Sequence, residues 1–310
     1  MSPLVSVIMP AWRPRADWLL EAVRSVLQDR SCALELLVVD DGSEQPVQDL
    51  LAAVDDPRLH VIRVPRCGPY AARAAASPAS RGEFVRFFDA DDVAEPGSTG
   101  RLLELAVDGG EALAYGATLM CDAALRPQRT ATSDLEGMVA ESCLIGGFDV
   151  FVVSLLFPRS VVDRAGPWEA GFAVSGDWDF VLRALEQAPV RRLDDVVTRY
   201  RRHAASVTKQ ADVAAGTIAG EMVLGRYFAR HPEQRRTPLE RRAYVRLYLD
   251  RALAHEWLGE HALAARQLAR AARLDPAAAL GTVVRWSCSR LRGFVARARK
   301  RPPAPARRQS

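Results

Sequence analysis

The 310-residue sequence predicts an α/β protein with a mostly parallel sheet and flanking helices, followed by an α-helical extension. Two observations lead to this prediction. Short apolar segments alternate with segments of helical spacing over the first hundred residues, and the pattern is helical throughout from about residue 213. Strands that alternate with helices of this size need crossover connections, which produce a parallel sheet with ligands at the carboxyl ends of its strands.

The first four strands are expected at residues 4–9, 35–39, 59–64 and 84–88, where short apolar runs occur. Helical spacing lies between them, at residues 18–27, 47–54 and 70–76. Further along, we expect a helix at 95–107, strands at "EALAYGATLM", "GFDVFVVSLLFP" and "VVTRYRRH", and a helix in "DWDFVLRALEQ". The domain boundaries are therefore predicted at 1–212, 213–280 and 281–310.

The composition is that of an ordinary globular protein, with 49% hydrophobic and 26% charged residues. The five cysteines are scattered and form no C-x-x-C pair, which predicts reduced thiols rather than disulfides or a zinc site. No run of about 18 apolar residues is present, and the N-terminal segment lacks the basic region of a secretory signal. We therefore expect a cytoplasmic protein.

The expected helical extension at 213–280 contains "LGEHALAARQLARAARLDP", which resembles the second half of a tetratricopeptide repeat. Stable arrays of this repeat need about three copies, so we expect a single packing hairpin rather than a peptide-binding scaffold. Plain amphipathic helices explain the stretch equally well.

The last segment, 281–310, has nine cations and no acidic residue. Its basic amphipathic part at 282–299 suits an anionic membrane surface at the inner face of the cytoplasmic membrane, and a solvated, disordered tail explains it equally well. Nucleic-acid binding is disfavoured because no platform of aromatic residues accompanies the charge.

The stretch "EFVRFFDADD" places three carboxylates within four positions at the end of the fourth expected strand, at Asp89, Asp91 and Asp92. Like charges this close repel one another unless a cation lies among them. Mg²⁺ and Mn²⁺ prefer oxygen ligands and commonly combine carboxylates with substrate phosphates. This Asp-x-Asp cluster therefore predicts a divalent metal site, with an acidic turn before the next helix as the alternative.

Three further stretches place polar residues at the ends of elements. Asp41 in "VVDDGS" either contacts a nucleotide or forms a turn after the second strand. Asp177 in "SGDWDF" either caps the expected helix or acts as a general base. His203 in "YRRH" is a metal ligand, a phosphate contact or a surface residue.

Five stretches, taken in their order along the chain, resemble the inverting, family 2 type glycosyltransferases. They are "VSVIMPAWRP", "LELLVVDDGS", "AARAAASPASRGEFVRFFDADD", "SGDWDFVLRAL" and "YRRHAASVT". The resemblance covers about residues 4–208. It implies the GT-A fold, a Rossmann-like sheet with flanking helices. It also implies Mn²⁺ or Mg²⁺ as cofactor, a nucleotide-diphosphate sugar as donor, and a glycan or lipid-linked acceptor of the cell envelope or of an exopolysaccharide.

The resemblance further implies a role for each matching residue. Asp91 would bind the divalent metal, with Asp92 and His203 as further metal contacts. Asp177 matches the general base that takes the proton of the acceptor hydroxyl. The nucleotide-sugar would be bound by residues of four stretches, namely Pro10, Ala11, Asp41, Arg73, Asp89 and Ala90.

Three positions depart from the family pattern, and the departures keep other functions open. They are Ala11-Trp12-Arg13 in place of a Tyr-Asn or Phe-Asn pair after the first strand's proline, Ala74 in place of Asn, and Gly176 in place of an acidic residue. One alternative is a transferase-like module that binds without catalysis. A sugar nucleotidyltransferase is less well supported, because the Gly-rich, Lys-containing phosphate loop expected after the first strand is missing.

Overall fold

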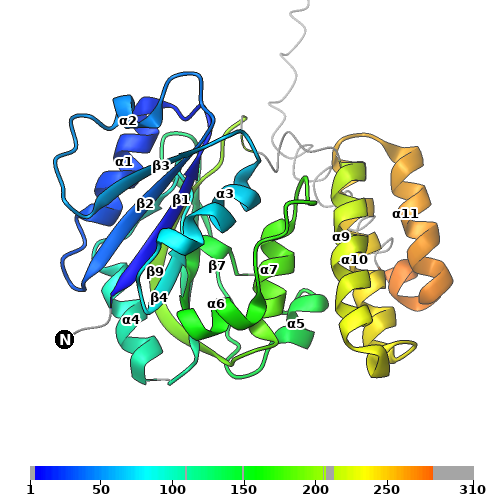
Figure 1. The fold of residues 1–310 in the computed structure, drawn as a ribbon. Helices are drawn as coiled ribbons and strands as arrows, with labels where there is room; N and C mark the ends of the chain where they lie inside the picture. The colour runs from blue at the N-terminus through cyan, green and yellow to red at the C-terminus, as the bar shows by residue number, and fades with distance from the viewer. Residues whose placement is uncertain (1–3, 109, 149, 205, 207–212, 282–310) are drawn as a thin grey trace, which may run out of the picture. The chain divides into compact units, whose positions relative to one another are not determined.

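The computed structural model describes residues 4–108, 110–148, 150–204, 206 and 213–281. The chain divides into two compact units between Tyr227 and Phe228. The first unit contains a sheet with its helices, and the second contains a helical hairpin (Figure 1). The expected tail at 281–310, with its basic amphipathic segment, lies outside the described residues except for residue 281.

Within the described residues, nine strands form one sheet with the order β3-β2-β1-β4-β8-β6-β9-β5, and β7 pairs with β6. The strands are β1 (Val5–Ala11), β2 (Leu34–Asp41), β3 (Leu59–Val64), β4 (Phe84–Phe87), β5 (Val93–Ala94), β6 (Leu113–Cys121), β7 (Pro127–Ala131), β8 (Leu155–Pro158) and β9 (Val190–Arg201). β1 is parallel to β2 and β4, and β2 is parallel to β3. The parallel sheet predicted for the first hundred residues is therefore confirmed.

The second half of the sheet is mixed. β8 is antiparallel to both β4 and β6, and β9 is parallel to β6. Two antiparallel steps restore the original direction, so β9 runs in the same direction as β4. The carboxyl ends of β1, β2, β4 and β9 consequently meet at one edge of the sheet, where ligands of such sheets bind.

Helices cover both faces of the sheet (Figure 1). Those of the first unit are α1 (Ala16–Leu27), α2 (Val47–Leu50), α3 (Pro69–Ala76), α4 (Ser98–Asp108), α5 (Ala140–Leu144), α6 (Arg159–Ala165), α7 (Gly176–Leu185) and most of α9 (Val213–Arg230). α1 and α4 pack on one face, while α3 and α6 pack on the other. Because both faces are covered, every residue of β1 and β2 except Pro10 is buried, and most of them are apolar.

One charged side chain lies at the centre of the sheet. Arg86 alternates with the apolar residues of β4 and has no exposed surface. Its guanidinium donates to the hydroxyls of Ser98, Thr99 and Thr198. Burial lowers the pKa of Arg86 to about 10. The side chain therefore joins β4 to β9 and to the start of α4 through neutral oxygens.

The strand expected in "GFDVFVVSLLFP" is much shorter than predicted. Only Leu155–Pro158 forms a strand, and Val152–Ser154 form a 3₁₀ turn before it. The carbonyl of Val153 accepts hydrogen bonds from the side chains of Arg86 and Thr198. These side-chain donors replace the partners that a neighbouring strand would have supplied, so the apolar pattern here reflects burial rather than a strand.

The first unit extends beyond the predicted boundary at residue 212, because α9 up to Tyr227 belongs to it. Arg226 on α9 forms ion pairs with Glu169 at 2.6 Å and with Asp179 at 3.2 Å. These contacts attach α9 to the loop before α7 and to α7 itself. Helical periodicity alone did not reveal which unit this helix joins.

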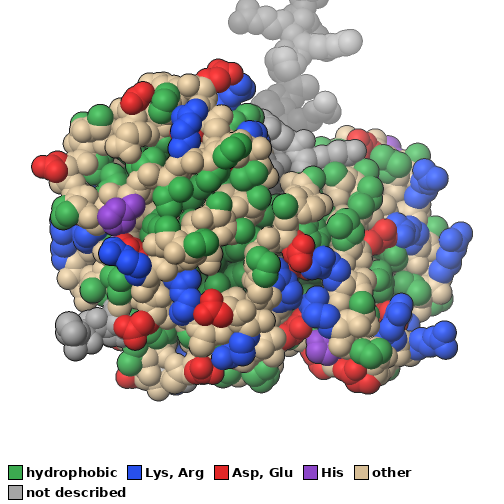
Figure 2. All heavy atoms as spheres, viewed as in Figure 1, with side chains coloured by type: hydrophobic (Ala, Val, Ile, Leu, Met, Phe, Trp, Pro, Cys, Tyr) green, Lys and Arg blue, Asp and Glu red, His purple; other side chains and the backbone are tan. Residues whose placement is uncertain are grey.

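The second unit contains α10 (Pro238–Trp257) and α11 (His261–Leu274), which pack against each other. Small side chains at Ala252, Ala264 and Ala271 are buried, which permits a close approach of the two helices. Exposed arginines are frequent on this hairpin (Figure 2), namely Arg241, Arg242, Arg246, Arg266 and Arg273. Among the described residues, no helix combines the length and the apolar character needed to cross a bilayer.

Candidate active site

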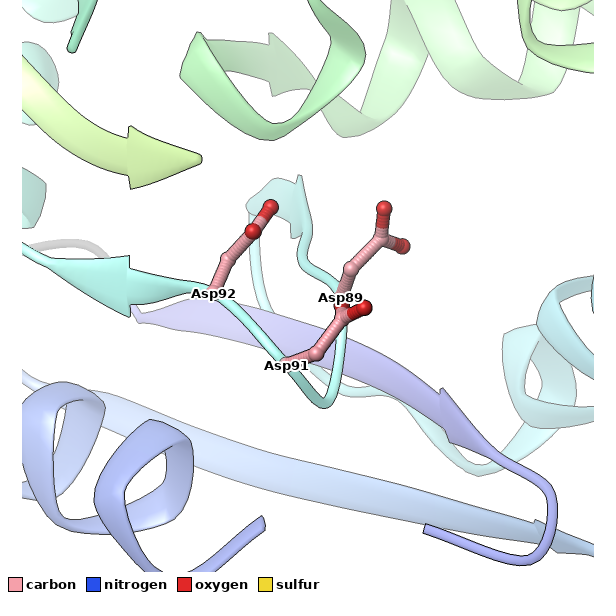
Figure 3. A group of neighbouring side chains, drawn as sticks. All are labelled: Asp89, Asp91 and Asp92. Carbon is pink, nitrogen blue, oxygen red and sulfur yellow. The ribbon is translucent and has the colours of Figure 1, made fainter. Parts of the chain in front are cut away.

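Three carboxylates lie together in the loop that joins β4 to β5 (Figure 3). Asp89, Asp91 and Asp92 each offer an oxygen, and these oxygens lie within 4.8 Å of one another. The loop turns immediately after the strand, because the backbone N of Asp92 donates to the carbonyl of Asp89 over 3.3 Å. Ala90 is half-buried in this turn. The tight turn makes the carboxylates converge.

Burial and mutual repulsion make the acidic cluster unfavourable when it holds no cation. Burial first, and then the charges of Asp91 and Asp89, raise the pKa of Asp92 well above its usual range. Burial also raises the pKa of Asp89, and Asp91 adds to the rise. The Oδ2 of Asp92 is buried and has no hydrogen-bond partner among the described residues. An orphaned carboxylate oxygen beside two other carboxylates fits a hard divalent cation such as Mg²⁺ or Mn²⁺.

His203 lies beside this cluster, just after the end of β9. Its Nε2 is 2.7 Å from Oδ2 of Asp91, although the two residues are 112 positions apart. The imidazole packs on Trp18 of α1, with ring centres 4.6 Å apart. The three predicted metal contacts, Asp91, Asp92 and His203, are therefore neighbours in the structure.

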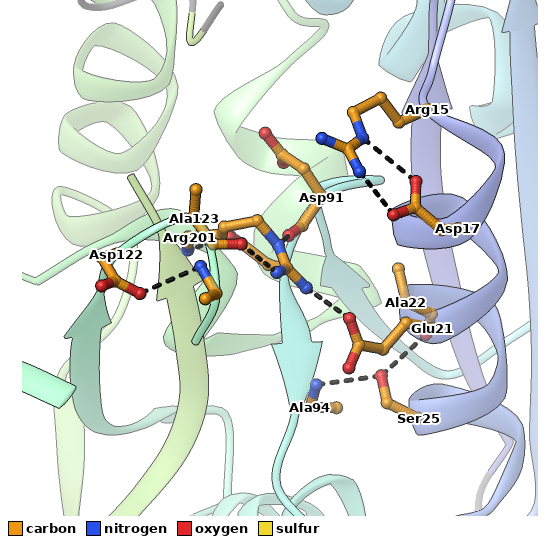
Figure 4. A network of polar contacts seen from close by, with 12 residues as sticks. Arg15, Asp17, Glu21, Ala22, Ser25, Asp91, Ala94, Asp122, Ala123 and Arg201 are labelled. Atoms are coloured by element: carbon orange, nitrogen blue, oxygen red, sulfur yellow. Dashed lines mark hydrogen bonds and ion pairs between the residues drawn. The ribbon is translucent and has the colours of Figure 1, made fainter. Parts of the chain in front are cut away.

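Arg201, at the end of β9, supports the acidic loop from behind (Figure 4). Its backbone N donates to Oδ1 of Asp92 and its Nε donates to the backbone carbonyl of Asp91, both over 2.8 Å. Its other guanidinium nitrogens donate to the carbonyl of Ala123 and to Glu21 on α1. The side chain is only 3% exposed. Arg201 therefore fixes the two carboxylate-bearing residues relative to β9.

Arg73 on α3 forms an ion pair with Asp89, the first carboxylate of the cluster. Its side chain is 5% exposed, and its guanidinium carbon lies 5.0 Å from the ring centre of Trp168. The charge of Arg73 lowers the pKa of Asp89 and so opposes the effect of burial. Arg73 consequently holds a positive charge beside the position where the resemblance expects the donor.

Asp177 is half-buried in the first turn of α7. Its charge contributes to the raised pKa of Asp89. The charge of Asp177 also acts on Tyr200 of β9. The pKa of this phenol is raised first by burial and then by all four carboxylates, which are Asp89, Asp92, Asp91 and Asp177. The charge of Asp177 therefore acts on the same groups, Tyr200 and Asp89, as the charges of the acidic cluster.

Asp179, the next acidic residue on α7, lies in a buried ion-pair network instead. Asp179 is 1% exposed and forms an ion pair with Arg183 at 2.9 Å, in addition to its contact with Arg226. The two aspartates of α7 thus have different surroundings, with Asp177 towards the acidic cluster and Asp179 in a buried ion-pair network.

Gly176, which replaces the acidic residue of the family pattern, is packed against Tyr70. A Cβ atom at position 176 would lie 2.8 Å from the ring of Tyr70. Ser175 before it adopts the left-handed conformation, with φ of 62°. The aromatic ring therefore occupies the space that a side chain at 176 would need, which accounts for the departure.

Both carboxylate oxygens of Asp41, at the end of β2, accept hydrogen bonds from the protein itself. Its Oδ1 accepts from the backbone N of Cys67 over 2.6 Å, and its Oδ2 accepts from the backbone N of Gly68 over 3.0 Å and from Arg66. The guanidinium carbon of Arg66 lies 3.8 Å from the ring centre of Trp12, which is 45% exposed. Asp41 therefore anchors the loop at 66–68, and Trp12 and Arg66 form the solvent-facing surface there.

The last two residues of β1, Pro10 and Ala11, lie directly beside β2. They pair with Val39 and Asp40, so they occupy the same edge of the sheet as Asp41. All the sequence-predicted site residues thus lie at the edge formed by the carboxyl ends of β1, β2, β4 and β9 or on the helices next to it.

Sequence reasoning missed the residues that support this site. Arg201 and Tyr200 belong to a stretch in which only His203 was singled out. Tyr70 and Trp168 each follow a Gly-Pro pair, and their rings stack with centres 6.0 Å apart. The repeated Gly-Pro-aromatic sequence is a signal that identifies both residues.

Comparisons with known proteins identify related sequences and a related fold. Residues 6–157 match the family described as glycosyl transferase family 2. The chain is 34% identical to the succinoglycan biosynthesis protein ExoO of Rhizobium meliloti over 36% of this chain and 32% of that protein. It is 33% identical to the putative teichuronic acid biosynthesis glycosyltransferase TuaG of Bacillus subtilis over 38% of this chain and 48% of that protein. It thus spans about a third to a half of these curated relatives.

Among solved structures, the S. aureus protein TarS (residues 1–349), crystallised in complex with UDP-GlcNAc, resembles this chain with a TM-score of 0.63. The similarity covers 87% of this chain and 81% of that one at 16% sequence identity, so it supports the fold. The GT-A fold expected from the sequence is therefore confirmed. Residues 6–157 of this chain are a family 2 glycosyltransferase domain.

Proposed function

We propose that this chain is a metal-dependent, inverting glycosyltransferase that moves a sugar from a nucleotide-diphosphate donor to an acceptor hydroxyl. The polysaccharide roles named for ExoO and TuaG suggest a glycan of the cell envelope or an exopolysaccharide as the product. One observation carries the proposal. Three carboxylates converge within 4.8 Å at the carboxyl edge of the sheet. The charge of Asp177 acts on Tyr200 together with the charges of these three carboxylates.

The proposed mechanism assigns separate roles to these carboxylates. A divalent cation bound by Asp91 and Asp92, with His203 nearby, would stabilise the negative charge on the leaving diphosphate. Asp89, oriented by Arg73, is placed to accept hydrogen bonds from the ribose or the donor sugar. Asp177 takes the proton from the acceptor hydroxyl as the new C–O bond forms. A single displacement by this route inverts the configuration of the sugar.

The nucleotide would lie at the corner formed by Pro10, Ala11 and the Asp41-anchored loop. Trp12 supplies an exposed aromatic face there, with Arg66 on it. TarS was crystallised with UDP-GlcNAc and with UDP, which makes UDP-sugars the first donors to test.

The decisive experiment measures release of nucleoside diphosphate from UDP-, GDP- and dTDP-sugars with MnCl₂ or with EDTA. We expect release that requires Mn²⁺, because the metal carries the leaving-group charge. Asp91→Ala should lower the rate at least about a hundredfold. Asp108→Ala, which changes an exposed aspartate at the end of α4, is the matched control and should keep the wild-type rate.

Two outcomes contradict the proposal in different ways. Donor cleavage that continues in EDTA would show that the metal has no part in the reaction. Binding of a UDP-sugar and Mn²⁺ without any cleavage or transfer would favour the alternative of a non-catalytic binding module.

A lipid-linked acceptor would place the enzyme at the inner face of the cytoplasmic membrane. The expectation that the tail mediates this contact concerns residues 282–310. Flotation with vesicles containing anionic lipid tests it, because deletion of 282–310 should release the protein from the vesicles. Unchanged flotation of the deletion variant would rule out the tail as the membrane contact.

A further inference from the structure

A cavity of about 240 Å³ lies in the first unit, between the sheet and two of its helices. It is lined by side chains from β1 and β4, by residues of α3 and α6, and by Trp168 and Phe180. A water molecule in the liquid takes up about 30 Å³, and an apolar cavity of about 150 Å³ binds benzene. The space is therefore large enough for a small organic molecule.

Two residues that line the cavity each carry a hydrogen-bond donor without a partner among the described residues. The Nε of Arg73 and the Nε1 of Trp168 are both buried and unpartnered among the described residues. Arg73 is 5% exposed and Trp168 is 6% exposed, so bulk water does not satisfy them. An unpaired buried N–H is costly, and such groups are rare in folded proteins. The two N–H groups therefore indicate a ligand that carries an acceptor.

The charge on the wall indicates an anionic acceptor. Arg159 on α6 also lines the cavity, and its guanidinium donates only to neutral oxygens, those of Gly82 and Ser80. It forms no ion pair within the part of the chain that the structure describes, and burial lowers its pKa despite the charges of Asp163 and Glu35. Asp163 is the acidic residue of the lining, and it is exposed, so water screens its charge.

Apart from Ser77, the rest of the lining is apolar. It includes Ile8, Val85, Phe87 and Phe180, all of which are buried. Phe87 and Phe180 pack edge to face with ring centres 5.2 Å apart, and both also contact Phe157 and Trp168, so the apolar side of the lining is a fixed aromatic cluster. A molecule that fits this lining has an anionic group at one end and an apolar body at the other.

We propose that this cavity is a second binding site, distinct from the donor site, for a small ligand that carries a carboxylate or phosphate group on an apolar body. The anionic oxygens accept hydrogen bonds from Arg73 Nε and Trp168 Nε1, and the apolar body packs on Phe87 and Phe180. Arg73 donates to Asp89 through a different nitrogen, Nη2. One guanidinium therefore contacts both sites, and occupation of the cavity acts on the orientation of Asp89.

Fluorine NMR of the full chain with 4-fluorobenzoate tests the proposal, with 4-fluorophenyl phosphate as the second probe. We expect saturable broadening of the fluorine signal with at least one of the two anions, and the stronger binder identifies the preferred group. Neutral 4-fluorobenzyl alcohol, which has a similar apolar body, should bind at least about tenfold more weakly. The reason is that a hydrogen bond to a charged group contributes more to the binding free energy than one between neutral groups.

Two variants locate the binding. Trp168→Phe keeps an aromatic ring but removes the N–H, and should weaken anion binding about tenfold. Arg159→Met removes the unpaired positive charge and should weaken it by a similar factor. Arg164→Met, on the same helix, is the matched control, because Arg164 is exposed, pairs with Glu111 and does not line the cavity. It should bind the anions as the wild type does.

The results separate this proposal from the proposed function. Binding that persists with saturating UDP and Mn²⁺ supports a distinct site, whereas displacement by UDP would show that the cavity belongs to the donor site and would overturn the proposal. Absence of saturable binding for both anions would also overturn it. So would Trp168→Phe and Arg159→Met variants that bind the anions as tightly as the wild type does. None of these outcomes bears on whether the chain transfers a sugar.

Discussion

The Nε of Arg201 donates to the backbone carbonyl of Asp91 over 2.8 Å, so an arginine on β9 holds the loop that carries the acidic cluster. The bond acts on the backbone and uses neither carboxylate oxygen of Asp91, of which Oδ2 contacts Nε2 of His203. Arg201 is therefore a positioning residue for the proposed metal site.

Replacement of this side chain should weaken metal binding without removing a ligand. In Arg201→Met the backbone bond to Asp92 is retained, whereas the contacts to Asp91, Ala123 and Glu21 are lost. We expect Mn²⁺ affinity to fall about ten- to a hundredfold, as for other residues that orient metal ligands. Titration calorimetry with MnCl₂ measures this change.

The control for this measurement is Arg199→Met, two residues earlier on β9. Arg199 is 40% exposed and pairs with Glu95 rather than with the acidic loop. Its replacement should leave Mn²⁺ affinity unchanged. Equal losses in the two variants would mean that general damage to β9, and not the support of Asp91, explains the result.

The two aspartates of α7 should respond in opposite ways to replacement. Asp177→Asn should reduce sugar transfer about a hundredfold or more, with little change in the free energy of unfolding or in donor binding, because only the base is lost. Asp179→Ala should lower the free energy of unfolding by about 3 kcal/mol, because it leaves Arg183 buried without its partner.

Chemical denaturation and a transfer assay on both variants test this difference. Normal transfer by Asp177→Asn would remove Asp177 as the base. A large loss of stability in that same variant would show that its role is structural.

The raised pKa of Asp92 predicts how the free energy of unfolding of the metal-free protein depends on pH. Its folded-state pKa is raised by burial and by its acidic neighbours above the unfolded value of about 3.9. The folded protein therefore holds this proton more tightly, and the associated stability is complete below about pH 4 and lost as the pH rises through the folded pKa. Asp89 acts in the same direction.

Measurements of the free energy of unfolding in EDTA across this range should show a loss with rising pH. Asp92→Asn should flatten the slope, because the amide does not ionise, and the exposed control Asp108→Asn should keep it. Mn²⁺ should restore stability to the wild type at neutral pH and have less effect on Asp92→Asn. A wild-type slope in Asp92→Asn would contradict this account.

Gly176 and Tyr70 should be coupled. Gly176→Ala places a methyl group 2.8 Å from the ring of Tyr70 and should lower the free energy of unfolding by about 1–3 kcal/mol. Tyr70→Leu in the same chain should recover part of this loss. Gly225→Ala is the control, because nothing lies within 4 Å of the new methyl group and alanine favours the helix α9.

A double-mutant cycle by thermal or chemical unfolding measures the coupling. Strictly additive losses in Gly176→Ala and Tyr70→Leu would show that the predicted clash is absent.

The sequence predicted the first half of the sheet well because local pattern determines it. The segments at β1 to β4 are short apolar runs with helices between them, and buried parallel strands have this pattern whatever their partners. The segment before β8 was predicted wrongly, since the carbonyl of Val153 bonds to Arg86 and Thr198, which are distant in sequence. Apolar content reports burial, and the hydrogen-bond partners decide the conformation.

The same distinction applies to the site. Residues at strand ends, such as Asp89 and Asp91, were predictable because the ends of parallel strands share one edge. The supports were not, because they depend on contacts between distant segments. Arg201 meets Asp92 from 109 positions away, and no local pattern marks either residue as the partner of the other.

These long separations have a consequence for biosynthesis. Asp89, Asp91 and Asp92 leave the ribosome well before Arg201 and His203, which hold and contact them in the finished protein. A nascent chain that ends before β9 thus carries the repelling carboxylates with Arg73 but without Arg201 and His203. Capture of the proposed cation would therefore be a late event in the synthesis of each new polypeptide, after the sheet is complete.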